Sequence, residues 1–181
     1  SYIQFIRELS LKCANNGVVL SVDNYVPSAY TAFYDREEQA NFADYVVIMG
    51  YDEHNGSSLE AGSVSSYEFV KEGIEETIKE VPAEKVINGI PFFTRLWSET
   101  PKTQEELNQE AGTEAADYPM KVTSEALGMS TARDKISQAG AETTLDETTG
   151  NNYATWEADG VTYEIWLEDA TSIEPKLQLM K

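Results

Sequence analysis

The chain of 181 residues is poor in several kinds of residue, and each shortage excludes a class of site. Its single cysteine, Cys13, excludes an internal disulfide, a cysteine-rich zinc site and a Cys-x-x-Cys redox motif. Its single histidine, His54, excludes a metal centre built from several histidines. No segment approaches the run of about 20 apolar residues that a membrane-spanning helix needs, and the first residues form no signal peptide. We therefore expect no metal ion, no cofactor and no membrane partner.

Basic side chains are also scarce, with 13 Lys and Arg against 32 Asp and Glu, for a net charge of −19. This charge argues against a nucleic-acid partner, because anionic polymers and anionic membranes repel such a surface. Hydrophobic residues make up 41% of the chain, which is enough for a sizeable core. The length suits one domain, or one domain that carries an insertion.

The spacing of apolar residues predicts alternating helices and strands before Trp97. Helices are expected over 2–14, 34–43 and 65–80, and strands over 18–27, 44–52 and 85–97. The second of these strands carries apolar residues on both faces, as in a parallel sheet covered by helices on both sides. This order is typical of an α/β protein with a parallel sheet and right-handed crossovers.

After Trp97 the composition and the pattern change. The segment is rich in Glu, Thr, Ala and Gly, with one helix expected near 123–138. The stretch "YATWEADGVTYEIW" (153–166) predicts a β-hairpin around Asp159-Gly160, a favoured two-residue turn. A last helix is expected to begin with Thr171 as its cap, with Pro175 in its first turn. We interpret this region as a small α+β insertion in the α/β framework.

Polar side chains follow three of the predicted strands, at the ends where the loops of a parallel sheet carry function. These side chains are Asp23, Asn24 and Tyr25; Tyr51, Asp52, Glu53 and His54; and Thr94, Arg95 and Trp97. Such a mixture suits a sugar, because aromatic rings stack on pyranose rings while carboxylates and Arg bind hydroxyl groups. It suits phosphate poorly, because no Gly-rich loop and no Lys stand nearby. We expect the three strand ends to converge on one carbohydrate cleft.

Four segments resemble one known family. "MGYDEH" (49–54) resembles the Met-x-Tyr-Asp signature of glycoside hydrolase family 18, the chitinase-like TIM barrels. "GIPFFTRLW" (89–97) is similar to the Gly-x-Pro-x-Tyr-x-Arg-x-Trp seventh strand of that family, with Phe93 at the usual Tyr position. "YEIWLEDATSIEPKLQLMK" resembles the segment that enters the last helix before strand eight, and "FIRELS…LSVDNYVP" resembles the helix after strand four and strand five. The resemblance is closest to bacterial cell-wall or spore-type members.

The resemblance implies a partial (β/α)8 TIM barrel. Residues 1–97 would form strands five to seven with their helices, 98–165 the α+β insertion after strand seven, and 166–181 the helix before strand eight. The part outside the insertion is about half of the roughly 250 residues of a whole barrel, so a fragment is expected. Half a barrel would have unpaired edges, and self-association through them is a further expectation.

The resemblance also implies a glycosidase that hydrolyses β-1,4-linked N-acetylglucosamine polymers, chitin or peptidoglycan glycan, by substrate-assisted retention. Tyr51 and Asp52 would hold the acetamide and hydroxyl groups of the sugar in subsite −1. The other candidate substrate contacts are Met49, Arg95, Asn24, Tyr25 and Trp97. The family's proton donor ends an Asp-x-x-Asp-x-Asp-x-Glu motif that this chain lacks. The chain alone is therefore expected to be inactive.

Each candidate also has a structural alternative. Tyr51 and Asp52 fit a hydrogen-bonded pair that closes a strand, and Arg95 fits a structural ion pair. Trp97 and Trp166 fit packing between the framework and the insertion as well as they fit sugar platforms.

The remaining polar candidates have structural alternatives of their own. A loop hydrogen bond is favoured for His54 over a catalytic role, since no nucleophile is apparent. Turn chemistry explains Asn24 nearly as well as substrate contact does. Glu168 and Asp169 are interpreted as complementing the dipole of the last helix.

A different functional class also stays open, a non-catalytic, lectin-like relative that has lost the acid. An extracellular or cell-wall location is inferred from the polymer alone.

Overall fold

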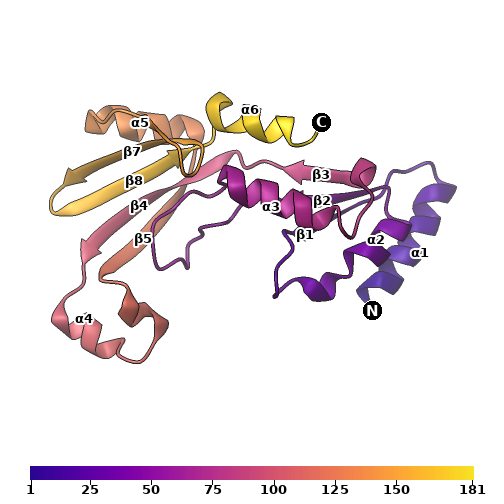
Figure 1. Ribbon diagram of the computed structural model, residues 1–181, viewed down its shortest axis with the longest axis horizontal. Helices are drawn as coiled ribbons and strands as arrows, with labels where there is room; N and C mark the ends of the chain where they lie inside the picture. The colour runs from indigo at the N-terminus through magenta and orange to yellow at the C-terminus, as the bar shows by residue number, and fades with distance from the viewer. The chain divides into compact units, whose positions relative to one another are not determined.

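The computed structural model describes all residues from 1 to 181, which fall into two compact units. The parallel unit comprises Ser1–Gly50, Glu68–Ile90 and Gln178–Lys181, and the antiparallel unit comprises Tyr51–Tyr67 and Pro91–Leu177. Each unit has its own sheet, drawn as one of the two groups of arrows in Figure 1. Each unit also has its own hydrophobic core. The chain is therefore a mixed α/β protein.

The parallel unit has a sheet of three short strands in the order β1-β2-β3. These are β1 (Ser21–Tyr25), β2 (Tyr45–Met49) and β3 (Val86–Gly89), and both pairings are parallel. The register sets Tyr25 opposite Met49 and Met49 opposite Gly89, so the carboxyl ends of the strands lie at one edge. The predicted parallel arrangement of these strands is confirmed.

Three helices belong wholly or largely to this unit. They are α1 (Tyr2–Asn15), α2 (Arg36–Phe42) and α3 (Tyr67–Thr77), with 3-10 turns η1 (Ala32–Tyr34) and η2 (Ala83–Lys85). Alternate strand residues point towards these helices and form the core. That core holds Ile6, Val22, Ala40, Ala43, Val46, Val81 and Val86, with Ile48, Val70 and Ile74 as a second cluster.

The strand predicted at 44–52 is not buried on both faces. Val46 and Ile48 are 0% exposed, whereas Tyr45, and Ile87 on the neighbouring strand, are each 41% exposed. The prediction that this strand is buried on both faces was wrong, because α1, α2 and α3 pack against alternate strand residues only.

The antiparallel unit is built on five strands in the order β5-β4-β8-β7-β6. They are β4 (Phe93–Pro101), β5 (Met120–Gly128), β6 (Thr144–Asp146), β7 (Asn151–Ala158) and β8 (Val161–Leu167). Its helices are α4 (Gln104–Gln109), α5 (Met129–Ala139), α6 (Ala170–Gln178) and the 3-10 turn η3 (Glu114–Asp117). Ala132 and Ile136 of α5 join Leu96 and Ile165 in the core.

The hairpin predicted around Asp159-Gly160 is confirmed. Ala158 pairs with Val161, and the two turn residues have φ angles of 51° and 78°. Positive φ at both central positions matches the right-handed twist of the flanking strands.

Three element predictions were wrong in detail. The strand expected at 85–97 is two strands in different sheets, because Pro91 between them has no N–H for a ladder. The helix expected near 123–138 begins only at Met129, because the preceding residues pair with β4 as β5. The last helix begins at Ala170, one residue before its expected cap, and Asp169 Oδ1 accepts a hydrogen bond from the Thr171 N–H at 2.9 Å.

None of the helices has both the length and the apolar character that crossing a bilayer requires.

Candidate functional site

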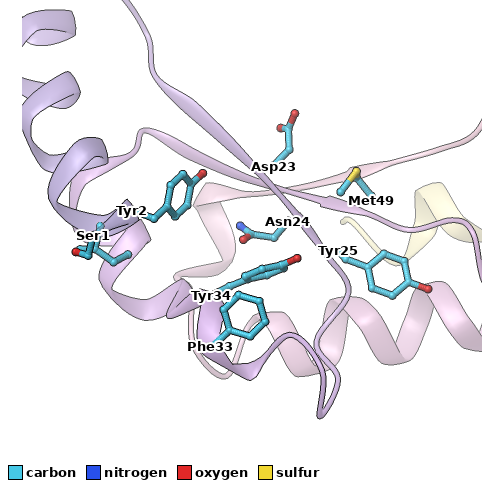
Figure 2. A pocket seen from close by; sticks show the side chains of 9 residues that line it. Ser1, Tyr2, Asp23, Asn24, Tyr25, Phe33, Tyr34 and Met49 are labelled. Atoms are coloured by element: carbon cyan, nitrogen blue, oxygen red, sulfur yellow. The ribbon is translucent and has the colours of Figure 1, made fainter.

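The carboxyl ends of β1 and β2 border a pocket of about 420 Å³ in the parallel unit. Tyr25 and Met49, which are opposite one another in register, both line it (Figure 2). Its wall also includes three aromatic rings, those of Tyr2, Phe33 and Tyr34. Two predicted substrate contacts therefore lie together beside a cavity that has more aromatic lining than the sequence patterns indicated.

Asn24 also borders this pocket, but its side chain is occupied. It is 3% exposed, and its Nδ2 donates to Gln39 Oε1 at 2.8 Å. Gln39 Nε2 donates in return to Asn24 Oδ1 at 3.1 Å. This reciprocal amide pair between β1 and α2 favours a structural role for Asn24, although not the turn role considered from the sequence.

Arg36 supports the same strand end and was not singled out by sequence patterns. It is 0% exposed, and its Nη2 donates to the Tyr25 carbonyl and to Thr31 Oγ1, both at 2.9 Å. Burial lowers the pKa of Arg36, and the Glu80 carboxylate, 3.9 Å from Nη1, opposes that shift. A buried guanidinium thus holds the backbone next to the Tyr25 side chain.

Tyr51 and Asp52 open the antiparallel unit. The ring of Tyr51 meets the ring of Phe93 edge to face, with centroids 6.1 Å apart and planes at 82°. Phe93 occupies the position where the resembled motif has Tyr. Asp52 has a φ angle of 63°, in the left-handed region where Asp is among the few tolerated residues. The chain therefore turns sharply at the predicted site carboxylate.

The segment after Asp52 runs out and returns, and its two limbs are hydrogen-bonded. The Glu53 N–H donates to the Val64 carbonyl at 3.0 Å, and His54 Nδ1 lies 2.9 Å from the Ser63 carbonyl oxygen. The loop hydrogen bond predicted for His54 is confirmed. A side chain at Gly62 would place its Cβ 2.5 Å from the imidazole, so this close approach requires glycine.

Arg95 lies on β4 with its guanidinium beside this segment. Its Nη1 donates to Ser124 Oγ at 3.0 Å and lies 3.4 Å from where a Cβ at Gly56 would be. Its Nε is buried and has no hydrogen-bond partner. The partner in this contact is the uncharged Ser124 hydroxyl, in place of the carboxylate that an ion pair would need.

The two tryptophans considered as sugar platforms are held by packing and hydrogen bonds. Trp97 is 1% exposed, and its indole N–H donates to the Gly62 carbonyl at 2.8 Å. Trp166 donates to Asp146 Oδ2 at 2.9 Å, and its ring centroid lies 4.8 Å from that of Tyr153. These contacts all lie within the antiparallel unit, and they favour packing over sugar stacking for both rings.

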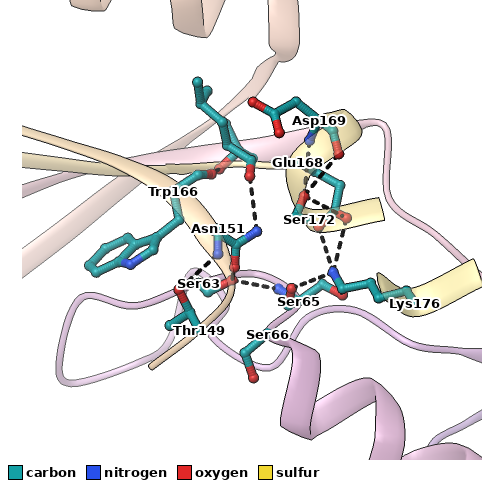
Figure 3. Close-up of polar contacts among 12 residues, drawn as sticks. Ser63, Ser65, Ser66, Thr149, Asn151, Trp166, Glu168, Asp169, Ser172 and Lys176 are labelled. Atoms are coloured by element: carbon teal, nitrogen blue, oxygen red, sulfur yellow. Dashed lines mark hydrogen bonds and ion pairs between the residues drawn. The ribbon is translucent and has the colours of Figure 1, made fainter. Parts of the chain in front are cut away.

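Glu168 makes a contact that the sequence patterns did not predict. Its carboxylate is buried and pairs with Lys176, whose Nζ lies 2.9 and 2.8 Å from the two carboxylate oxygens (Figure 3). Burial raises the pKa of Glu168, and the ammonium group of Lys176 opposes that shift. Glu168 thus pairs with a buried cation in addition to binding Ser172 in the first turn of α6, and Asp169 caps this helix.

A second acidic group lies on the sheet of this unit. Burial raises the pKa of Glu99, and the neighbouring Glu164 carboxylate adds to the rise. Tyr153 donates its hydroxyl to Glu164, and burial together with this bond raises the pKa of the phenol to about 12. No sequence signal marked these groups, because they come from three strands that only the sheet brings together.

No group of three or more His, Cys, Asp or Glu side chains is arranged to hold a metal ion.

Comparison with known proteins matches this arrangement to one family. The profile of "Glycosyl hydrolases family 18" matches residues 1–181. YdhD of Bacillus subtilis, named as a sporulation-specific glycosylase, is 25% identical over 98% of this chain but only 39% of its own length. The chain thus spans less than half of this curated relative.

Solved structures share the fold. A C-terminal domain from Desulfitobacterium hafniense, named as a chitinase, has a TM-score of 0.81 at 21% identity over 99% of this chain and 51% of its own. A family 18 chitinase from Cycas revoluta in complex with (GlcNAc)3 has a TM-score of 0.72 at 24% identity, over 99% and 54%. The profile match covers the full length of the chain, and the four sequence motifs agree with it. The chain belongs to family 18 of the glycosyl hydrolases.

Proposed function

We propose that this chain is part of a glycosidase that hydrolyses β-1,4-linked N-acetylglucosamine polymers, either chitin or the glycan of peptidoglycan. The observation that carries the proposal is the Tyr51-Asp52 pair directly after β2, in a chain that the family profile matches throughout. The (GlcNAc)3 complex of the Cycas revoluta chitinase supports an N-acetylglucosamine ligand. The net charge of −19 favours a neutral glycan over a polyanion.

The proposed chemistry is substrate-assisted retention. The acetamide oxygen of the sugar attacks the anomeric carbon while the bond to the leaving oxygen breaks, and a glutamic acid protonates that oxygen. Tyr51 and Asp52 hold the acetamide so that its oxygen faces the anomeric carbon, which is catalysis by proximity. Further contacts with the glycan are assigned to Arg95 and to Tyr25 and Met49, which line the pocket of the parallel unit. Asn24 and Trp97, also predicted from the sequence, are buried and are bound to Gln39 and to the Gly62 carbonyl.

The proposal includes a finer description of the fold. The strands β1, β2 and β3 correspond to strands five to seven of a (β/α)8 barrel. Residues 98–165 are the α+β insertion, and 166–181 lead into the helix before strand eight. An extracellular or cell-wall location follows from the polymer that such an enzyme would act on.

Turnover by this chain alone is not expected, because its 181 residues hold no Asp-x-x-Asp-x-Asp-x-Glu sequence to supply the proton donor. The test is incubation with an aryl chitobioside, for which we expect no release above background. Measurable turnover by the purified chain would contradict the assignment of the acid to that motif.

Sugar binding tests the assignment of Tyr51 and Asp52. We expect (GlcNAc)3 to bind in calorimetry or saturation-transfer NMR, and Tyr51→Phe and Asp52→Asn to weaken it about ten-fold or more. Asp159→Asn is the matched control, because Asp159 also has a positive φ, 51°, but lies in the β7–β8 hairpin. Equal affinities for the Asp52 and Asp159 variants would remove the support for this site.

The second candidate is a lectin-like protein that binds the same glycan without cleaving it. The coding sequence directly upstream of Ser1 separates the two functions. An Asp-x-x-Asp-x-Asp-x-Glu ending in Glu supports the glycosidase, and replacement of that Glu supports the binding protein.

Self-association belongs to the same proposal. The strands β1 and β3 are the edges of the parallel sheet, and Tyr45 and Ile87 on that sheet are each 41% exposed. Unpaired strand edges with apolar neighbours favour pairing with another chain. Light scattering at micromolar concentration is expected to give more than the monomer mass of 20.2 kDa, and a monodisperse monomer would contradict this.

A further inference from the structure

The antiparallel unit contains an ion pair that the proposed chemistry does not use. Lys176 and Glu168 are 1% and 6% exposed, and the ammonium group contacts both carboxylate oxygens. Ser172 Oγ donates to Glu168 Oε1 at 3.1 Å. A pair buried this deeply costs desolvation, and well-packed apolar residues often replace such pairs without loss of stability. Stability alone therefore gives little reason for the pair.

The remaining contacts of Lys176 go to a single residue far away in sequence. Its Nζ donates to the Ser65 carbonyl at 2.6 Å and contacts Ser65 Oγ at 3.1 Å. The Ser65 N–H in turn donates to Ser63 Oγ at 3.1 Å, and Ser63 donates to Asn151 Oδ1 at 2.8 Å. Figure 3 shows this chain of contacts from the start of β7 to α6. It fixes residues 63–66, which we name the return limb.

The return limb holds the residues that follow the proposed sugar-binding pair. Besides the Glu53–Val64 and His54–Ser63 contacts, Ser66 binds the Glu53 carboxylate twice, through its N–H at 2.8 Å and its Oγ at 3.0 Å. We name residues 51–54 the outgoing limb. The outgoing limb is thus bonded to a return limb that is itself anchored by Lys176.

We propose that Lys176 and Glu168 are positioning residues for Tyr51 and Asp52, acting through Ser65 and the paired limbs. This inference rests on the proposed function. Glu168 fixes the ammonium group, the ammonium group fixes Ser65, and the return limb fixes the backbone directly after Asp52. The need for this anchor follows from the φ angle of 63° at Asp52, since a left-handed residue keeps its geometry only where its surroundings determine it.

The double variant K176M/E168Q separates positioning from stability. It removes both charges, so we expect a melting temperature within a few degrees of the unaltered chain. A methionine side chain in place of Lys176 donates no hydrogen bond to Ser65. The hydrogen exchange of the Glu53 amide is therefore expected to rise about ten-fold. The imidazole resonances of His54, the single histidine, are expected to shift. Unchanged exchange at Glu53 together with an unchanged His54 spectrum would overturn the proposal.

Ser65→Ala provides a second test that leaves the ion pair intact. It removes one of the two contacts of Lys176 with Ser65, and we expect a smaller rise, a few-fold, in exchange at Glu53. If the double variant does not fold, this variant decides, and no change in it counts against the proposal. The matched control is K79M/E76Q, which removes an exposed ion pair on the parallel unit and is expected to leave His54 unchanged.

Binding of (GlcNAc)3 connects the inference to function. We expect K176M/E168Q to weaken binding several-fold while the control variant does not. If the unaltered chain fails to bind the trisaccharide, the proposed function fails, whereas exchange at Glu53 and the His54 spectrum still decide the positioning role. If the chain binds and the double variant binds equally well, the positioning role is overturned and the proposed function stands.

Discussion

The two units bury their sheets in different ways. In the parallel unit, helices cover alternate residues of β1, β2 and β3, while Tyr45 and Ile87 stay 41% exposed. In the antiparallel unit, α5 packs on one side of β4 and β8, and the segment around Gly62 binds Trp97 on the same sheet. Both sheets end in unpaired strands, β1 and β3 in the parallel unit and β5 and β6 in the antiparallel unit. The comparison therefore concerns which residues cover the faces of each sheet.

The largest expected difference concerns the two fully buried cations, one in each unit. Lys176→Met leaves the Glu168 carboxylate buried without its partner, so the free energy of unfolding should fall by about 3–5 kcal/mol. Arg36→Met leaves Glu80, whose side chain is 39% exposed, so a loss of about 1–3 kcal/mol is expected. Urea unfolding monitored by circular dichroism measures both.

If Arg36→Met lowered the free energy of unfolding more than Lys176→Met, the hydrogen bonds of Arg36 to backbone carbonyls would stabilise the protein more than the buried pair of Lys176 and Glu168 does. Lys71→Met, at a half-buried lysine of α3, serves as the baseline for loss of a lysine.

The two cores should also respond differently to the same truncation. Ile165 and Ile48 are both 0% exposed. Ile165→Ala is expected to cost about 4 kcal/mol and Ile48→Ala about 3 kcal/mol, because a sheet with an open face collapses more easily around a cavity. Ile87→Ala, at a residue 41% exposed, should cost less than either. Equal losses at Ile165 and Ile48 in urea unfolding would show that the open face has no effect on packing.

A pH-dependent effect on stability is expected at Tyr153 of the antiparallel unit. The pKa of Tyr153 is raised to about 12 by burial and its bond to Glu164. The folded state therefore favours the protonated phenol. Its stabilising contribution is complete below the ordinary value of 10 and is lost as the pH rises towards 12. Tyr153→Phe should lessen the fall in melting temperature over this interval.

Ultraviolet absorbance of tyrosinate gives the control. The Tyr153→Phe variant should have one phenol fewer that ionises at high pH. Identical titration curves for the variant and the unaltered chain would contradict the raised pKa of Tyr153.

The smallest effect concerns the turn where the antiparallel unit begins. Asp52→Gly relieves the strain of a left-handed residue, so a gain of up to about 1 kcal/mol in unfolding free energy is expected. The same change removes the carboxylate and should abolish (GlcNAc)3 binding. Thermal unfolding and calorimetry measure the two effects, and a loss of stability would mean that the carboxylate contributes more than the strain costs.

Local patterns predicted most elements but not which sheet each strand joins. The helix near 2–14 and the hairpin at Asp159-Gly160 follow from spacing and turn chemistry, which depend on neighbours in the chain. The strand expected at 85–97 was wrong because its two halves pair with strands from different units. Apolar residues are equally compatible with either sheet, so only the pairing partners decide.

The sequence likewise predicted only part of the site. The motifs around Tyr51 and Arg95 indicated the family, since they carry residue types at fixed spacing. They did not reveal that Asn24 is bound to Gln39 or that Trp97 is buried. A pattern identifies which side chains are present, whereas burial depends on segments that arrive from elsewhere in the chain.

The sequence by itself determined the family, the acidic character and the order of helices and strands in the parallel unit, because each of these depends on residue identity and short-range spacing. Only the tertiary structure decided that Lys176 meets Ser65, a contact across 111 positions of the chain, while it pairs with Glu168 eight positions away. Such contacts form when packing removes two groups from water and leaves each as the other's hydrogen-bond partner.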